Sequence, residues 1–221
     1  MKSVVVIPAY NEGKVIAEVI NDIKKHQFND VIVVDDGSSD DTYEIVKRID
    51  GKIIALRHRI NLGKGAALKT GCEAAIKLGA DIIVFMDSDG QHKPEDISRF
   101  IEKLEKDNLD IVFGSRRIGK DMPLVMMLGN KFLSLAISLL FKIYISDTQS
   151  GFRVFRSSVY PKIKWNSTRY AVETEMIVNT SKKKLKFAEI EIKTIYNDNY
   201  KGTTIFDGLR IFYNILIWRI I

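Results

Sequence analysis

The sequence predicts an α/β fold in which helices flank both faces of a doubly wound, mostly parallel β-sheet. Short, continuous apolar runs recur from residue 3 to about residue 115, and segments with helical periodicity lie between them. Strand–helix units joined by short links build a sheet of this kind. A chain of 221 residues also suits a single domain, 1–221, that buries a full core.

Five apolar runs are expected to be strands, because such runs suit strands that are buried on both faces of a sheet. In chain order they are Val4–Ile7, Val31–Val34, Ile53–Leu56, Ile82–Phe85 and Ile111–Phe113. Apolar residues repeat at helical spacing from Val15 to Ile23 and from Ile97 to Leu104, the latter after Pro94, which suits a helix start. The single cysteine, Cys72, lies in an alanine-rich helical stretch and is expected in the core.

Two later segments predict amphipathic helices at a membrane interface. Residues 124–145 are mostly apolar, but Lys131 and Lys142 would make a true membrane span costly. The segment 207–221 ends in an apolar, aromatic stretch that is too short to span a bilayer. Both segments therefore suit helices that lie in the interface, and ordinary core helices are the alternative.

The net charge of +6 and the pI near 9.2 favour an anionic partner, which could be a nucleotide, a lipid phosphate, a membrane surface or nucleic acid. One cysteine excludes an internal disulfide and a cysteine-based zinc site, and it fits a cytoplasmic setting. Because Met1 to Ser3 lead straight into a strand, no signal peptide is expected. The expected location is the cytoplasmic face of the cell membrane, bound peripherally, and the oligomeric state stays open.

Polar side chains follow the first, second and fourth predicted strands, and ligands bind beyond the carboxyl ends of such strands. The sharpest cluster contains Asp87, Ser88, Asp89 and Gln91. Carboxylate and amide oxygens suit Mg²⁺ or Mn²⁺ rather than zinc, and a cation there could bridge the two phosphates of a nucleotide diphosphate. The alternative is a loop whose aspartates only cap the next helix.

Other polar groups leave several roles open. Asp36 ends the second strand beside another carboxylate, which would be costly unless a donor such as a ribose hydroxyl meets them. Residues 61–65 precede a helix, as a phosphate-binding loop does, but they match neither the Walker A pattern nor the three-glycine dinucleotide fingerprint. Arg116 and Arg153 suit phosphate, and Asp147 suits a general base or a contact to sugar hydroxyls, as does Glu173.

Six segments occur in the order that is typical of glycosyltransferase family 2, and together they cover nearly the whole chain: 6–12, 34–38, 61–65, 87–91, 114–116 and 149–153. The chain resembles this family, and it is most similar to the branch of dolichyl- or polyprenyl-phosphate sugar synthases. The resemblance implies a GT-A fold and a metal-dependent, inverting hexosyltransferase. Its donor would be a UDP- or GDP-linked sugar, its acceptor dolichyl or polyprenyl phosphate, and its cofactor Mg²⁺ or Mn²⁺.

The resemblance also implies roles for individual residues. Nucleotide-sugar contacts are expected from Pro8, Tyr10, Glu12, Asp36, Lys64, Asp87, Ser88 and Lys201. Metal binding is expected from Asp89 and Gln91, and catalytic roles from Asp87, Asp89 and, for a hydroxyl acceptor, Asp147. The acceptor phosphate would meet Arg116, Lys131, Ser134 and Arg153. Many relatives carry an arginine shortly before Gly129-Asn130, and this chain has none there, so Lys131 and Ser134 would replace it.

Three other functions compete with this interpretation. A transferase that extends a lipid-linked or polymeric glycan at a sugar hydroxyl would need a base, for which Asp147 is the best candidate. A sugar nucleotidyltransferase would favour a glycine-rich first loop, where this chain has residues 8–11, Pro-Ala-Tyr-Asn. A nucleic-acid partner is not expected, because the polar residues at the strand ends are mostly acidic and no aromatic stacking positions lie beside basic patches.

Overall fold

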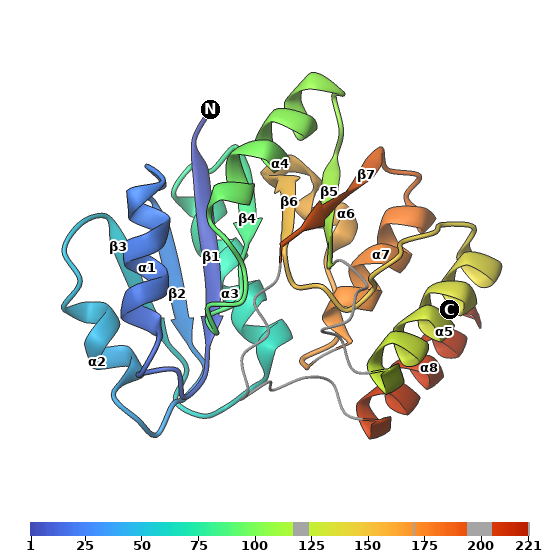
Figure 1. Ribbon diagram of the computed structural model, residues 1–221, viewed down its shortest axis with the longest axis horizontal. Helices are drawn as coiled ribbons and strands as arrows, with labels where there is room; N and C mark the ends of the chain where they lie inside the picture. The colour runs from blue at the N-terminus through green and yellow to red at the C-terminus, as the bar shows by residue number, and fades with distance from the viewer. Residues whose placement is uncertain (117–123, 170, 194–204, 221) are drawn as a thin grey trace.

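The computed structural model describes residues 1–116, 124–169, 171–193 and 205–220. Within these ranges, seven strands form one sheet in the order β3-β2-β1-β4-β6-β5-β7 (Figure 1). Neighbouring strands are parallel except for β6, which runs antiparallel to β4 and β5. The bounds are β1 Ser3–Ala9, β2 Val31–Asp35, β3 Ile53–Arg57, β4 Ile82–Phe85, β5 Ile111–Arg116, β6 Arg153–Arg156 and β7 Phe187–Ile192.

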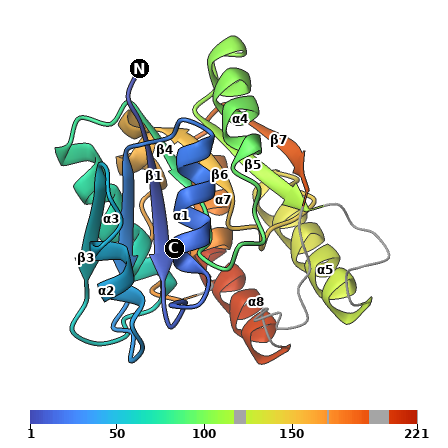
Figure 2. The same ribbon diagram turned by 60° about the vertical axis from the view of Figure 1, so that its left-hand side comes forward.

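Helices cover both faces of the sheet (Figures 1 and 2). One face carries α1 Ile16–Lys25, α2 Thr42–Lys47 and α4 Glu95–Lys106. The other face carries α3 Lys64–Lys77, α6 Tyr160–Ile163, which follows the 3₁₀ helix η1 Ser157–Val159, and α7 Val172–Lys182. Two further helices, α5 Leu124–Phe141 and α8 Ile205–Ile220, pack against each other and against α7.

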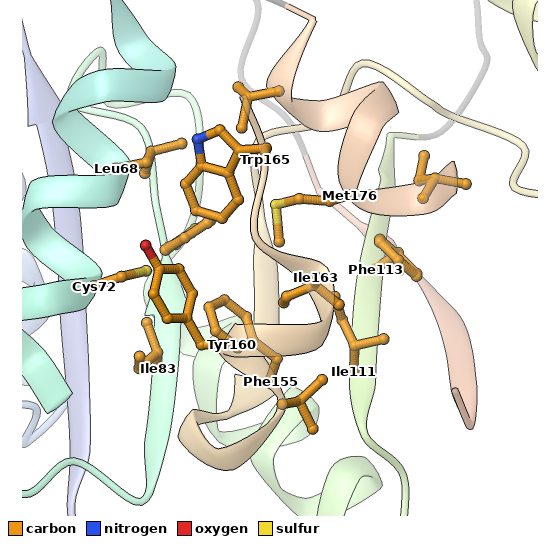
Figure 3. Packing of buried hydrophobic residues seen from close by; sticks show 14 of the residues in the cluster. Leu68, Cys72, Ile83, Ile111, Phe113, Phe155, Tyr160, Ile163, Trp165 and Met176 are labelled. Atoms are coloured by element: carbon orange, nitrogen blue, oxygen red, sulfur yellow. The ribbon is translucent and has the colours of Figure 1, made fainter. Parts of the chain in front are cut away.

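Each strand serves two cores, because successive side chains of a strand point to opposite faces. On β1, Val5 and Ile7 pack with α1 and α4, whereas Val4 and Val6 pack with α3. Figure 3 shows the second core, in which Trp165 fills the space between α3 and the strands. The layered α/β architecture that the sequence predicts is therefore confirmed, and Cys72 is buried in the core as expected.

All five predicted strands are present, but β6 and β7 were not predicted. In β6 two arginines, Arg153 and Arg156, flank two apolar residues, so that no continuous apolar run marks the strand. In β7 apolar residues alternate with Glu189 and Glu191, a pattern that suits an edge strand with one exposed side. The antiparallel insertion of β6 depends on pairing with β4 and β5, which are distant in sequence.

The predicted helix over 124–145 is too long by four residues. The helix α5 ends at Phe141, because Lys142 adopts a left-handed backbone conformation with φ of 57°. Both α5 and α8 bury one side and expose large apolar side chains on the other. These exposed side chains, called the α5–α8 apolar surface below, are Leu128, Phe132, Leu135, Leu139, Phe206, Leu209, Tyr213, Leu216 and Ile220. None of the helices in the described ranges is both long and apolar enough to cross a bilayer.

Candidate active site

The polar segments that follow β1, β2 and β4 meet at one edge of the sheet. The three strands are parallel, and their registers pair Ala9 with Asp35 and Val6 with Phe85, so their carboxyl ends lie side by side. A backbone hydrogen bond of 2.8 Å from Asp36 N to Ala9 O continues the alignment past the strand ends. In Figure 1 this edge is at the bottom, where the arrows of β1 and β2 end.

The loops after β1 and β2 are tied to each other by side chains. The Ser38 hydroxyl accepts a hydrogen bond from Asn11 N at 2.8 Å, and the Asn11 side-chain oxygen accepts one from Ser39 N at 2.9 Å. Glu12 N donates to the Thr42 hydroxyl at 2.9 Å. Of the residues predicted to contact the nucleotide here, Pro8 is buried and Glu12 half-buried, whereas Tyr10 is 45% exposed. Tyr10 therefore presents an aromatic face beside this edge.

Asp36 organises the segment that leads into α3. Its carboxylate accepts hydrogen bonds from Leu62 N at 3.0 Å and from Gly63 N at 2.7 Å. It also pairs at 2.7 Å with Nδ1 of His58, whose Nε2 lies 2.9 Å from the Thr70 hydroxyl. The carboxylate is almost completely buried. The sequence predicts hydrogen-bond donors around Asp36, and the structure provides the amides of Leu62 and Gly63 and the ring of His58.

Lys64, the first residue of α3, lies between two carboxylates. Its ammonium is 2.7 Å from Asp87 Oδ1, at the end of β4, and 2.8 Å from Glu173 Oε1, in the first turn of α7. Burial alone would lower the pKa of Lys64, but the two negative charges outweigh burial and raise this pKa. Burial would raise the pKa of Asp87, and the charge of Lys64 lowers it instead. Lys64 and Asp87 are therefore both charged at neutral pH.

The backbone amides at the start of α3 are already bonded within the protein. Gly65 N donates to Thr168 O at 2.8 Å, and Ala67 N donates to Gly63 O at 3.2 Å. Glu175 fixes the segment around Thr168 by accepting hydrogen bonds from Asn166 N and Ser167 N, both at 2.9 Å. The amides of Leu62, Gly63 and Gly65 are therefore bonded within the protein, and Lys64 places its ammonium beside Asp87.

The glycines of this loop permit the close approach. A Cβ atom on Gly63 or Gly65 would collide with the backbone of residues 167–168, and Gly63 also has a φ of 98°. Trp165 Nε1 donates to Gly65 O at 2.9 Å, which joins the loop to the second core. Packing against a segment 100 residues later thus places Lys64 beside Asp87.

Asp89 and Gln91 follow Asp87 in a short turn. Gln91 N donates to Asp89 Oδ1 at 3.0 Å, and Asp87 N donates to Nδ1 of the buried His92 at 3.2 Å. Burial, and then the charge of Asp87, raise the pKa of Asp89. Lys64 balances the charge of Asp87, whereas no described lysine or arginine forms an ion pair with Asp89. A cation bound beside Asp89 would offset the effect of burial and of the Asp87 charge on its carboxylate.

The donor set around Asp89 fits a hard cation that shares its coordination with a substrate. Among the residues that the structure describes, no group of three or more His, Cys, Asp or Glu side chains is arranged to hold a metal ion. Magnesium characteristically needs only one or two carboxylates when phosphates and water supply the remaining oxygens. Asp89 and Gln91 stay the predicted ligands of such an ion.

Gly151 packs directly on the Asp87 carboxylate. A Cβ atom at position 151 would lie 2.7 Å from Asp87 Oδ1 and 2.8 Å from its Cγ, and closer still to Oδ2. Phe152, the next residue, contacts the His92 ring edge-to-face at 5.4 Å between centroids. The segment before β6 therefore forms one wall of the acidic cluster, and only glycine fits where it meets Asp87.

A second polar cluster lies at the end of β5, around a buried carboxylate. Asp147 accepts two hydrogen bonds from the Arg116 guanidinium, from Nε at 2.6 Å and from Nη2 at 3.0 Å. It accepts three more, from Arg116 N at 3.1 Å, from the Asn130 amide at 3.1 Å and from Gln149 N at 3.2 Å. The Asp147 side chain has no exposed surface. Buried and held by these donors, the carboxylate has no access to a substrate in this conformation.

The residues predicted to bind the acceptor phosphate have different surroundings. Arg116 keeps a small exposed fraction and Lys131 is exposed on α5, whereas Ser134 is buried and donates to Ser146 O at 3.3 Å. Arg153 is also buried, with its guanidinium 5.0 Å from the centre of the Phe113 ring, and burial lowers its pKa to about 10 despite nearby carboxylates. A phosphate has no surface of Arg153 to touch in this conformation. Lys201 lies outside the described residues.

Sequence reasoning missed several residues that shape the site. His58 and Glu175 hold the two sides of the loop before Lys64, while Asn130 and Glu189 hold the turn that contains Asp147. Asn130 and Ser134 stand one helical turn apart within an apolar segment, a spacing that places both on one face of a helix. That spacing was the available signal for Asn130. The others contact partners that are distant in sequence.

The chain is similar to known glycosyltransferases over most of its length. The model of Glycosyl transferase family 2 matches residues 4–164. The UDP-N-acetylglucosamine–dolichyl-phosphate N-acetylglucosaminyltransferase of Methanococcus voltae is 38% identical over 97% of this chain and 94% of its own length. The dolichol-phosphate mannosyltransferase of Pyrococcus furiosus is 29% identical over 99% of this chain and 65% of its own.

Solved structures agree on the fold. Glucosyl-3-phosphoglycerate synthase from Mycobacterium tuberculosis, crystallised with Mn²⁺, UDP-glucose and phosphoglyceric acid, superposes with a TM-score of 0.73 at 20% sequence identity. The superposition covers 100% of this chain and 80% of that one. With the family model, the relatives and the sheet in agreement, the chain belongs to glycosyltransferase family 2 and is a glycosyltransferase with the GT-A fold.

Proposed function

We propose that the protein transfers a sugar, with inversion at the anomeric carbon, from a UDP- or GDP-linked donor to dolichyl or polyprenyl phosphate. Two relatives that span nearly all of this chain carry dolichyl phosphate or dolichol phosphate in their names. The site supports the same chemistry, because an acidic cluster at β4 lies beside arginine and lysine side chains that suit phosphate.

The state of Asp147 is the observation that carries this proposal. A lipid monophosphate is already an anion near neutral pH, so its attack on the sugar needs no strong base. A sugar hydroxyl would need one. Asp147 is buried and accepts five hydrogen bonds, and Glu173 is buried and paired with Lys64, so neither suits that task. This favours the phosphate acceptor over extension of a glycan at a hydroxyl.

The donor is proposed to bind along the edge formed by β1, β2 and β4. Tyr10 and Glu12 would contact the base and ribose, with Pro8 beneath them and Asp36 holding the loop beside them. The Lys64 ammonium and the Asp87 and Ser88 segment would meet the diphosphate. Lys64 lies 2.7 Å from Asp87, and it can exchange a carboxylate partner for a phosphate oxygen without changing its charge.

A divalent ion, Mg²⁺ or Mn²⁺, is proposed to be held by Asp89 and Gln91 together with the donor diphosphate. Bound there, it would neutralise the negative charge that develops on the departing diphosphate. The oxygen-only donor set supports this ion, and so do the burial and the neighbouring Asp87 charge that raise the pKa of Asp89. The solved relative from Mycobacterium tuberculosis was crystallised with Mn²⁺ and a uridine nucleotide.

Arg116 is proposed to orient the acceptor phosphate toward the sugar. Asp147 fixes its guanidinium by two hydrogen bonds, so that its direction is set before the substrate arrives. Lys131, exposed on α5, would add charge on the approach path. Ser134 and Arg153 would act without touching the phosphate. Ser134 would hold Ser146 by its hydrogen bond, and Arg153 would contribute its buried positive charge.

The α5–α8 apolar surface is proposed to dock on a membrane without crossing it. Its aromatic and aliphatic side chains are exposed, and Phe132 and Phe212 pack together at 5.0 Å between ring centroids where the two helices meet. Exposed Lys131, Lys142 and Arg210 on the same helices or at their ends would attract anionic lipid. Docking there would let the acceptor keep its tail in the bilayer. The cytoplasmic side stays a prediction from cysteine usage.

A product analysis tests the proposed function. The protein is incubated with UDP- and GDP-linked sugars, one at a time, and a short polyprenyl phosphate, and the lipids are weighed by mass spectrometry. The proposal expects one donor to give a product heavier by one sugar residue. If no donor modifies the prenyl phosphate while a prenyl-linked sugar is extended, the hydroxyl acceptor is correct instead.

A further inference from the structure

The inner side of α5 is bonded to the turn that carries Asp147. Asn130 is 5% exposed, and its side-chain NH₂ donates to Ser146 O at 3.2 Å and to Asp147 Oδ1 at 3.1 Å. Its side-chain oxygen accepts hydrogen bonds from Thr148 N at 3.1 Å and from the Thr148 hydroxyl at 3.0 Å. One amide therefore contacts three successive residues of the turn. The Thr148 N–H must face an oxygen, so the amide can adopt only this orientation.

The same turn is also held by β7. A single oxygen of Glu189 accepts hydrogen bonds from Ser146 N and the Ser146 hydroxyl, both at 2.8 Å, and from Asp147 N at 3.3 Å. Glu189 thus fixes the backbone of the turn, whereas Asn130 contacts the Asp147 carboxylate itself. The orientation of that carboxylate therefore depends on α5.

Asp147 passes this orientation to Arg116. The carboxylate bonds two guanidinium nitrogens and the backbone N–H of Arg116, so a rotation of the carboxylate would move the guanidinium with it. Asn130 and Arg116 share one oxygen, Asp147 Oδ1, which links the amide directly to the arginine pair. Hydrogen bonds through Asp147 therefore connect α5, which carries Leu128 and Phe132 on its exposed side, to Arg116 at the end of β5.

We propose that Asn130 is a positioning residue: it fixes Asp147 and, through Asp147, the guanidinium of Arg116. Helix α5, which presents part of the apolar surface, then also orients the Arg116 guanidinium that binds the acceptor phosphate. A lipid-borne phosphate would therefore meet an arginine that is already oriented. This consequence for the acceptor rests on the proposed function, whereas the coupling of Asn130 to Arg116 does not.

Two substitutions separate positioning from mere folding. Asn130→Ala removes all four hydrogen bonds of the amide. Asn130→Asp keeps an oxygen for Thr148 but sets a second carboxylate against Asp147 when it is ionised. At lower pH the protonated acid can again donate to Asp147, so this variant should recover as the pH falls. Among the residues that the structure describes, the charged groups around this position are Asp147, Arg116, Glu189 and Arg153.

The matched control is Asn179→Ala. Asn179 is a helical asparagine on α7, and its side chain donates to Lys164 O at 2.9 Å, outside the turn at 146–148. This variant tests the effect of losing an asparagine from a helix where its side chain makes no contact with the turn at 146–148. The control should leave both the arginine signal and the kinetics unchanged.

The first readout is the Nε–H signal of Arg116 in ¹H–¹⁵N NMR spectra, assigned with Arg116→Lys. In the wild type, the hydrogen bond to Asp147 should give a shifted, slowly exchanging signal. The signal should move toward the position of a free arginine in Asn130→Ala. In Asn130→Asp it should return toward the wild-type position between about pH 8 and about pH 5. A wild-type signal in Asn130→Ala would overturn the inference, whatever the activity.

The second readout is steady-state kinetics with a short prenyl phosphate. Asn130→Ala should raise the acceptor KM by about tenfold or more and change the donor KM by less than about twofold. Equal loss toward both substrates, with no recovery of Asn130→Asp at low pH, would overturn the positioning role and leave a structural one. If the wild type transfers no sugar to prenyl phosphate, the proposed function fails, and the arginine signal still decides the inference about Asn130.

Discussion

Replacing Gly151 by alanine should impair catalysis far more than it impairs folding. The new Cβ atom would lie 2.7 Å from Asp87 Oδ1 and closer still to Oδ2, and ordinary contact requires about 3.5 Å, so the carboxylate would have to retreat by about 1 Å. Asp87 cannot retreat freely, because its other contact is the Lys64 ammonium at 2.7 Å. A misplacement of about 1 Å at a reacting site can cost about a hundredfold in rate, equivalent to about 2.7 kcal/mol. We expect a loss of about ten- to a hundredfold in kcat/KM.

The assay is sugar transfer measured beside the melting temperature. Gly208→Ala is the matched control, since a Cβ atom at position 208, within α8, meets no other atom within 4 Å. Alanine is a better helix former than glycine, so the control should keep full activity and melt at the same temperature or slightly higher. If Gly151→Ala keeps wild-type kcat/KM at an unchanged melting temperature, the position of Asp87 does not limit the reaction and the reasoning is refuted.

Three further predictions concern the metal and the membrane. Excess chelator should abolish transfer, and Mg²⁺ or Mn²⁺ should restore it. Metal affinity should fall as the pH is lowered, because the pKa of Asp89 is raised and protons compete with the metal for its carboxylate. Full turnover in excess chelator would exclude the metal role. Asp89→Ala should lose activity by at least about a hundredfold with an unchanged melting temperature, and an active, stable variant would show that the site is misassigned. In flotation assays the protein should rise with anionic liposomes, and high salt should release part of it. The substitution Phe132→Glu places a negative charge on the α5–α8 apolar surface and should weaken this binding. Protein that never floats would contradict docking.

The convergence of the acidic cluster could be predicted from the sequence, because it follows from local pattern alone. Continuous apolar runs identified β1, β2 and β4, and parallel strands bring their carboxyl ends together, so that Asp36 and Asp87 had to share one edge. The apolar character of α5 and α8 follows from composition in the same way, whereas the exposure of many of their apolar side chains does not.

The partners of those groups could not be predicted, because they come from segments that are distant in sequence. Lys64 lies beside Asp87 at the start of a helix whose first amides donate to Thr168 O, and nothing near Lys64 in the sequence indicates either contact. Asp147 looks like an available base in the sequence, whereas pairing with Arg116 across 31 residues buries it. The end of α5 depends on the backbone conformation of one lysine, Lys142, which apolar periodicity does not reveal.

The acceptor group tests the central claim most directly. The product formed from an α-linked nucleotide-sugar and a short prenyl phosphate is examined by ³¹P and ¹H NMR. The account predicts that the phosphomonoester signal is replaced by that of a sugar phosphodiester, and that the anomeric proton shows the inverted, β configuration. A phosphomonoester signal that persists while the nucleotide-sugar is consumed, or a product with retained configuration, would contradict it.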